Sequence, residues 1–289
     1  MRESAVAFVD EASDCTLLVD GIYGGGNEAY MEGKSELKLG CITSMDVLYG
    51  GSRRADVGGD IELTITSGHF GRVFGGNNES GHVRGTITVN IEETGCYPVT
   101  IGELYGGGNL AAYSVEDIPA NHPSRSKEED DEDYYLNYPK VNVKSFTSIG
   151  RVFGGGLGET AVVTGNPMVN INVVEGEKAS YTPEPDAVFA GTTINLGDGT
   201  TVDLPAHTAG AIGAIGTVFG GGNAAKVDGN TTVKIGTETT IDYVSKIGDE
   251  TAPRTNISVK GVKIIDNVYG GGNNADVTGK TNVVIGREN

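Results

Sequence analysis

The chain has 289 residues, enough for one large domain or two ordinary ones, and it contains 46 glycines but only 9 prolines. Its 39 acidic residues outnumber the 21 basic ones, and this negative charge disfavours binding to nucleic-acid phosphates and to anionic membranes. No stretch of about 18 consecutive apolar residues is present, so we predict no membrane insertion by this segment.

A repeated motif runs through the chain, in which an aromatic residue is followed by two or three glycines and usually by an asparagine. In six of the seven copies a second glycine follows ten to twelve residues after the aromatic residue. Apolar and polar residues alternate around this second glycine, which is typical of β-strands. Each copy should therefore hold about three short strands. The seven aromatic anchors are Tyr23, Tyr49, Phe74, Tyr105, Phe153, Phe219 and Tyr269.

The shortest copies span 25 or 26 residues from one anchor to the next. Propeller blades usually need about 40 residues, and a sandwich gives no reason for a glycine triplet at a constant place. A repeat of this size suits one rung of a coil whose strands stack in parallel, with glycine corners at positive φ. We expect an all-β fold, a single-stranded parallel β-helix (β-solenoid) of about seven rungs that forms one repeat domain over residues 1–289.

Side chains at equivalent places of successive rungs are expected to stack. The aromatic anchors would then form one column at an inner corner. The asparagines four residues after an anchor would form a second column, with amides bonding from rung to rung. We interpret both columns as structural; a ligand site along the asparagines is the weaker alternative. These asparagines are Asn27, Asn78, Asn109, Asn223 and Asn273, and Arg53 and Leu157 interrupt the row.

Insertions lengthen the coil at residues 115–140, 174–218 and 236–268, and insertions along the edge of a solenoid often bind ligands. The second insertion contains TTINLGDGTTVDL, two alternating runs around Gly197-Asp198-Gly199 that predict a hairpin. The third contains NISVKGVKII, which predicts another pair of strands around Gly261.

The first insertion is acidic and nearly free of aliphatic residues, so we expect residues 115–140 to form a mobile loop. It includes six consecutive carboxylates, which are most simply a solvated run of charge. The alternative is weak calcium binding, since hard cations take carboxylate oxygens. No other cofactor is predicted. The candidate calcium ligands are Asp130, Asp131 and Asp133.

Cysteine and histidine spacings indicate no metal or catalytic centre. Cys15 and Cys41 stand 26 residues apart, so they should be neighbours on successive rungs, where both a disulfide and a reduced pair fit. The four histidines share no recurring spacing with a nucleophile or with further metal ligands. We therefore predict that the chain is not an enzyme and assign no catalytic residue.

The segments VYGGGNNADVTGKTNVVIG and VFGGGNAAKVDGNTTVKIG resemble the glycine-rich (YGGGN-type) β-helix repeat of large adhesin-like surface proteins from gut-dwelling anaerobic bacteria. The resemblance covers Ile22 to Ile285 outside the insertions. It implies secretion, a display role and further repeats of the same polypeptide, and it carries no catalytic residues. The first residues lack the apolar segment of a secretion signal.

These observations favour a non-catalytic, extracellular or cell-surface scaffold that binds a glycan or protein of a host or the environment through its corner insertions. A carbohydrate-active enzyme (a polysaccharide lyase or hydrolase on a β-helix) and a structural spacer or fibre segment are the alternatives. The candidate ligand-binding residues either stack on a sugar ring or hold the loop against the rod; they are Tyr134, Tyr135 and Tyr138.

Overall fold

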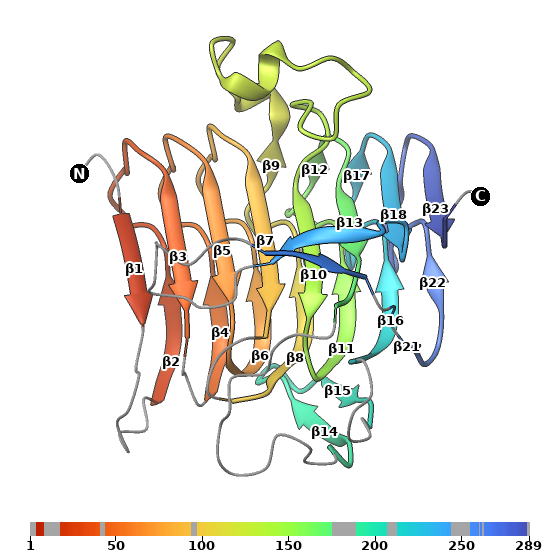
Figure 1. The fold of residues 1–289 in the computed structure, drawn as a ribbon. Helices are drawn as coiled ribbons and strands as arrows, with labels where there is room; N and C mark the ends of the chain where they lie inside the picture. Colours follow the sequence, from red (N-terminus) through yellow and green to blue (C-terminus); the bar gives the residue numbers. More distant parts are fainter. Residues whose placement is uncertain are drawn as a thin grey trace.

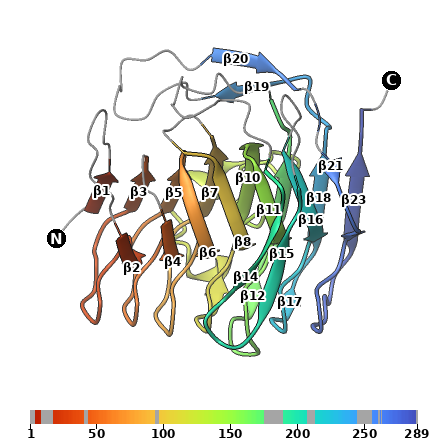
Figure 2. The same cartoon turned by 90° about the horizontal axis from the view of Figure 1, so that it is seen from below.

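The computed structural model describes residues 4–8, 18–40, 44–93, 97–174, 189–206, 213–243, 255–259, 261 and 263–287. It shows an all-β protein of mainly parallel sheets, in which successive strands of the repeat alternate between two large sheets (Figure 1). Seen from below, these two sheets lie opposite each other (Figure 2). Cys15 and Cys41 lie outside the described residues.

The first sheet holds eight strands in chain order, and every pair of neighbouring strands in it is parallel. Its strands are β1 (Ser4–Phe8), β3 (Ser35–Leu39), β5 (Ile61–Ile65), β7 (Ile87–Glu92), β10 (Lys140–Ser145), β13 (Met168–Ile171), β18 (Thr231–Ile235) and β23 (Thr281–Ile285).

The second sheet is also parallel, and the anchor residues end its strands. Its strands are β2 (Leu18–Tyr23), β4 (Ser44–Tyr49), β6 (Gly68–Phe74), β8 (Val99–Tyr105), β11 (Ser148–Phe153), β16 (Ala214–Phe219), β21 (Lys263–Ile264) and β22 (Val268–Tyr269). A third, shorter sheet joins β9 (Tyr113–Ser114), β12 (Val163–Thr164) and β17 (Val227–Asp228).

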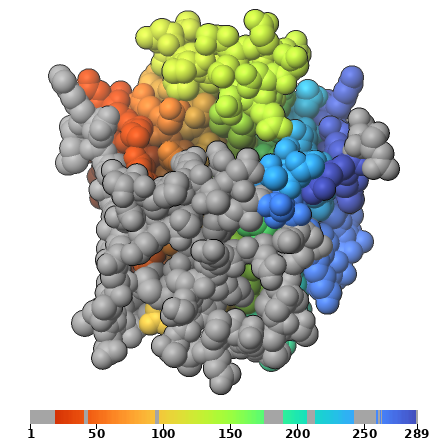
Figure 3. Space-filling model, in the orientation of Figure 1, coloured from red at the N-terminus to blue at the C-terminus, as the bar shows by residue number. Residues whose placement is uncertain are grey.

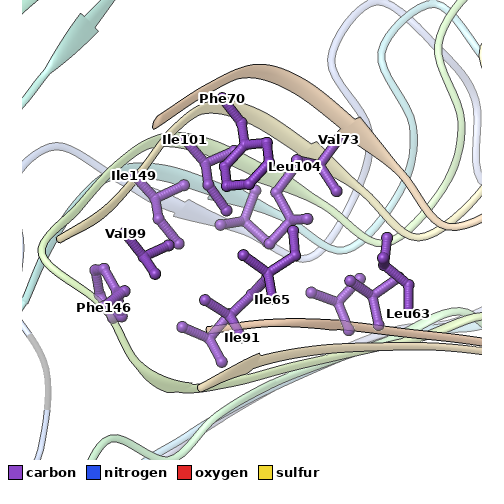
Figure 4. Close-up of a cluster of buried hydrophobic side chains, with 14 of the residues drawn as sticks. Leu63, Ile65, Phe70, Val73, Ile91, Val99, Ile101, Leu104, Phe146 and Ile149 are labelled. Atoms are coloured by element: carbon purple, nitrogen blue, oxygen red, sulfur yellow. The ribbon is translucent and has the colours of Figure 1, made fainter. Parts of the chain in front are cut away.

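The main core lies between the two large sheets, where alternate side chains of each strand face inward (Figure 4). Leu63 and Ile65 of β5 are fully buried against residues such as Val73 and Leu104 of the second sheet. A second core, here called the side core, lies against the third sheet. It contains Met31, Val57, Ile61, Val83, Ile87, Tyr113, Val115, Ile118, Tyr138, Val163 and Val227.

The seven anchor rings form one column. Ring centroids of neighbours are 4.7 to 5.0 Å apart, and their planes lie within 12° of each other. Burial raises the pKa of the Tyr49 hydroxyl to about 12. The Tyr105 hydroxyl donates to Glu103 Oε2 at 2.9 Å and accepts from Asn223 Nδ2 at 3.1 Å. The five central rings, Tyr49 to Phe219, are therefore buried packing elements, and the Tyr105 hydroxyl is satisfied within the protein.

The row of asparagines beside the rings is divided into short segments. Asn109 Nδ2 donates to Asn78 Oδ1 at 2.9 Å, and Asn273 Nδ2 donates to Asn223 Oδ1 at 3.0 Å. At Leu157 no amide continues the row, and Asn223 instead reaches across to the hydroxyl of Tyr105. The bonds connect neighbouring copies of the repeat, which is the structural role that we expected from these amides.

The glycine triplets serve close approach between copies rather than positive φ. None of the triplet glycines in the described ranges has a positive φ, so that expectation was wrong. A Cβ on Gly75 would lie 2.4 Å from the backbone oxygen of Gly106, and a Cβ on Gly221 would lie 2.8 Å from the backbone nitrogen of Gly272. Glycine is required here because the backbone of the next copy occupies the space of a side chain.

The predicted hairpin of the second insertion is present as β14 (Thr192–Asn195) and β15 (Thr201–Leu204) and covers the outside of the second sheet (Figure 2). Gly102 and Gly150 leave room for the apolar side chains of this hairpin. A Cβ on Gly102 would lie 2.6 Å from Ile194 Cδ1, and a Cβ on Gly150 would lie 2.5 Å from Val202 Cγ2. Arg72 joins the hairpin to the sheet, with Nη1 2.7 Å from Asp198 Oδ2 and Nε 2.9 Å from the buried Glu103.

The third insertion differs from the predicted pair of strands around Gly261. Its β20 (Thr255–Ser258) pairs with β19 (Thr240–Tyr243) in an antiparallel hairpin, whereas β21 joins the second sheet beside β16. The two runs around Gly261 therefore belong to different sheets. The β19–β20 hairpin lies on the outer side of the first sheet (Figure 2).

Replacing Gly221 by alanine should destabilise the protein by about 1–3 kcal/mol, because the added methyl group would meet the backbone of Gly271 and Gly272. Gly271 holds the same place in the next triplet, and a Cβ there meets nothing within 4 Å. Gly271→Ala is therefore the matched control and should change the free energy of unfolding by less than about 0.5 kcal/mol. Urea unfolding of both variants measures the difference; equal values would contradict the packing role.

Because the Tyr49 hydroxyl is buried, the stability of the folded protein should fall at alkaline pH. An unfolded tyrosine ionises near pH 10, but the buried hydroxyl resists ionisation up to about pH 12. The contribution of Tyr49 to stability is thus complete below about pH 10 and lost as the pH rises towards 12. A tyrosinate absorbance titration should show a delayed step that shrinks in Tyr49→Phe. Tyr30→Phe removes the hydroxyl group of a residue that is 57% exposed and should leave that step unchanged.

Candidate functional site

A second row of asparagines lies on the outer face of the first sheet. This outer asparagine row consists of Asn90 on β7, Asn142 on β10 and Asn170 on β13, which are direct neighbours in the strand register. Asn142 Nδ2 donates to Asn90 Oδ1 and Asn170 Nδ2 donates to Asn142 Oδ1, both at 3.0 Å. The amides therefore point the same way. Asn170 Oδ1, at the end of the row, is buried and has no hydrogen-bond partner among the described residues.

Two adjoining pockets, here called the outer pockets, lie along this row. The larger has a volume of about 480 Å³ and is lined by Asp60, Ile61, Glu62, Thr64, Thr86, Thr88, Asn90, Glu92, Asp133, Asn142 and Lys144. The smaller has a volume of about 270 Å³ and is lined by Glu132, Asn142, Val143, Lys144, Asn170, Asn172, Glu238, Thr240 and Ile241. The pockets share Asn142 and Lys144, and together they have a size that suits a small ligand.

Two insertions supply walls of the outer pockets. Glu132 and Asp133 come from the insertion at 115–140, which stands at the upper edge of the molecule (Figure 3). Glu238 and the β19 residues come from the insertion at 236–268, and the Glu238 backbone nitrogen donates to Asn172 Oδ1 at 3.0 Å. The repeat thus provides the floor of the site, and the insertions provide its sides.

Charges around the outer pockets are largely engaged by one another. Lys144 Nζ lies 2.6 Å from Glu92 Oε1, and Lys234 Nζ contacts Glu132. Lys140 Nζ lies 2.7 Å from Asp133 Oδ1, and this hydrogen bond lowers the pKa of the Asp133 carboxyl. Among the described residues, six carboxylates but only one lysine line the pockets. Their surface is therefore polar and negative.

The insertion at 115–140 packs against the side core, so the expectation of a mobile loop was wrong. It contains two short 3-10 helices, η1 (Val115–Asp117) and η2 (Pro123–Ser126). Val115 and Ile118 are 1% and 2% exposed. Arg125 Cζ lies 3.8 Å from the centre of the Tyr135 ring. A few apolar residues are sufficient to anchor this acidic segment because Val115, Ile118 and Tyr138 belong to the side core.

An Asp60–His122–Ser124 chain of contacts ties the same insertion to the corner before β5. His122 Nε2 lies 3.0 Å from Asp60 Oδ1, and His122 Nδ1 lies 2.8 Å from Ser124 Oγ. This order of groups resembles a nucleophile relay. However, Ser124 is only 5% exposed, and its own backbone nitrogen donates to the same Nδ1. Asp60 Oδ1 also accepts from the backbone and hydroxyl of Thr86. We therefore interpret these contacts as a tether.

The predicted ligand-binding tyrosines lie within the packed insertion. Tyr138 is only 6% exposed, and its hydroxyl bonds to Asp133. The Tyr135 ring lies under the Arg125 guanidinium group. The Tyr134 ring packs edge to face against the Tyr135 ring, with the two centroids 4.8 Å apart. None of the three lines an outer pocket. Their observed contacts match the alternative interpretation, in which they hold the insertion against the sheets.

The predicted calcium ligands do not converge. Asp133 contacts Lys140, and Asp131 Oδ2 lies 3.4 Å from Lys127 Nζ. No group of three histidine, cysteine, aspartate or glutamate side chains suited to a metal ion occurs in the part of the chain that the structure describes. Asp131 and Asp133 are therefore each held by a different lysine, and the described side chains do not bring Asp130, Asp131 and Asp133 together around one point.

The outer asparagine row was not predicted from the sequence. Asn90 and Asn170 each stand five residues after the second glycine of their repeats, Gly85 and Gly165, and this spacing could have paired them. Asn142 follows the insertion at 115–140 and has no such glycine before it. Its alignment with Asn90 is therefore known only from the pairing of β10 with β7 in the structure.

Comparisons with protein-family models, with curated proteins and with solved structures find no match to this chain. Within the described ranges, no helix has the length and apolar character needed to cross a bilayer.

Truncating Ile118 tests whether the acidic insertion is anchored. Ile118→Ala should lower the free energy of unfolding by about 2–4 kcal/mol, because it leaves a cavity in the side core. The matched control is Ile265→Ala, since Ile265 is 44% exposed and its truncation should have little effect. Thermal or urea unfolding measures both variants. A mobile insertion would make the two substitutions equally harmless.

Proposed function

We propose that the chain winds as a single-stranded parallel β-solenoid of about seven rungs and acts as a non-catalytic scaffold that displays binding surfaces. The alternation of strands between two parallel sheets supports the coil, as does the continuous column of anchor rings. The resemblance to adhesin-like repeats supports a cell-surface or extracellular location. The ligand class that we favour is a glycan of a host or of the environment.

The outer pockets are the observation that carries this proposal. They combine a floor of regularly spaced polar side chains with walls from two separate insertions. Each described carboxyl group whose pKa clearly departs from its ordinary value has that pKa lowered: Glu36, Asp56, Glu79, Asp133 and Asp198. A glycosidase acid needs the opposite shift. Of these five groups, Asp133 lines an outer pocket, and its lowered pKa does not suit the role of such an acid.

A spacer or fibre segment is the second candidate function. Tyr269, Val283 and Ile285 are 46%, 39% and 67% exposed and lie at the open end of the inward columns. Another copy of the repeat, from this polypeptide or from a second one, would continue the same columns. This role is compatible with display, because a longer rod would carry the outer pockets further from a surface.

A glycan array probed with the purified chain tests the main proposal. We expect retention of a restricted set of glycans. The same glycans incubated with the chain in solution should yield no new reducing ends and no unsaturated sugars. Release of either product would replace the scaffold by the carbohydrate-active enzyme. Failure to retain any glycan would remove the favoured ligand class.

A further inference from the structure

The two outer pockets form one elongated site on the first sheet. They share Asn142 and Lys144, and their floor runs across β5, β7, β10 and β13. Neighbouring strands lie about 4.8 Å apart, so this floor extends for roughly 14 Å across the strands. A site of this length suits several units of an extended ligand rather than a single compact molecule.

The floor of this site alternates hydrogen-bond donors and acceptors. Each asparagine amide carries both functions, and Thr64 and Thr88 add hydroxyl groups beside the row. Within the row, each bond uses the nitrogen of one amide and the oxygen of the amide before it. Asn170 Oδ1 is left as a buried acceptor without a described partner at the smaller pocket. A donor from a ligand or an ordered water would satisfy it.

Charge restricts the ligand further. Asp60, Glu62, Glu92, Glu132, Asp133 and Glu238 line the site, and a polyanion would be repelled. The lysine that lines both pockets already contacts Glu92 at 2.6 Å, so it offers little compensation. Hydroxyl groups suit this surface because they donate to carboxylates and amide oxygens and accept from amide nitrogens without adding charge.

We propose that the outer pockets bind an uncharged oligosaccharide in an extended form, laid across the strands along Asn90, Asn142 and Asn170. This inference rests on the proposed glycan-binding function and assigns its site and ligand class. The walls from Glu132 and Thr240 hold the sugar units over the floor. No aromatic residue occurs among the described residues that line the pockets. Recognition therefore depends on the positions of sugar hydroxyls, and an epimer that misplaces one leaves a polar group unpaired.

Two substitutions test this site. Asn142→Ala removes the central amide of the row and should weaken binding about tenfold or more, because the amides of Asn90 and Asn170 each lose a partner. Thr88→Arg instead fills the larger pocket from its floor and leaves the row intact. Its matched control is Thr232→Arg, in the same outward row of the first sheet but lining neither pocket.

Binding is measured by titration calorimetry with a neutral oligosaccharide chosen from the array, and melting curves establish that each variant is folded. We expect wild-type affinity in Thr232→Arg and at least a tenfold loss in Thr88→Arg and Asn142→Ala. If Asn142→Ala fails to fold, the two arginine variants decide the question.

Equal affinity in all variants would overturn this site and leave glycan binding elsewhere on the scaffold. Selective binding of a uronic-acid polymer or of a basic peptide would overturn the uncharged ligand class. Absence of binding to every glycan would overturn both this inference and the proposed glycan-binding function.

Discussion

The structure depends on the close contact of glycine backbones between neighbouring copies of the repeat. At Gly75 the next chain segment comes so near that a Cβ would stand 2.4 Å from the Gly106 oxygen. This contact keeps the strands at normal sheet spacing next to the corner, where side chains would otherwise push them apart. The anchor rings are adjacent in sequence to these glycines and stack at 4.7 to 5.0 Å, which matches that spacing. Between the inner copies, the absence of side chains in the triplets therefore allows the rings beside them to stack at this spacing.

The periodic part of the fold could be predicted because parallel, in-register pairing places equivalent residues side by side. Tyr23 to Tyr269 occur at constant places in the repeat, and the same rule brings their rings together. The hairpin around Gly197 was also predictable, since it forms from adjacent residues. The role of the glycine triplets could not be predicted in the same way. Glycine occurs both where the backbone needs a positive φ and where a neighbouring backbone leaves no space for a side chain, and composition does not distinguish these two reasons.

The insertions show why the rest of the site could not be predicted. Residues 115–140 have the composition of a solvated loop, yet Val115, Ile118 and Tyr138 enter the side core. Asp60 and His122 are 62 residues apart, and only the folded chain brings them together. The outer pockets combine such contacts with the register of β10, which follows the insertion. Their position is thus set by pairings between segments whose separation in sequence follows no repeat.

The two faces of the first sheet differ in the residue types that they can carry. Inward positions pack against the second sheet, so they are restricted to apolar residues such as Leu63 and Val89. Outward positions meet solvent or an insertion, and along one row they change from Glu62 to Thr88, Lys140 and Met168. In the adjacent row, three successive strands, β7, β10 and β13, carry an asparagine, and the insertions meet over these strands. Outward residues can therefore vary more widely than inward ones, because they do not belong to the apolar columns between the two sheets.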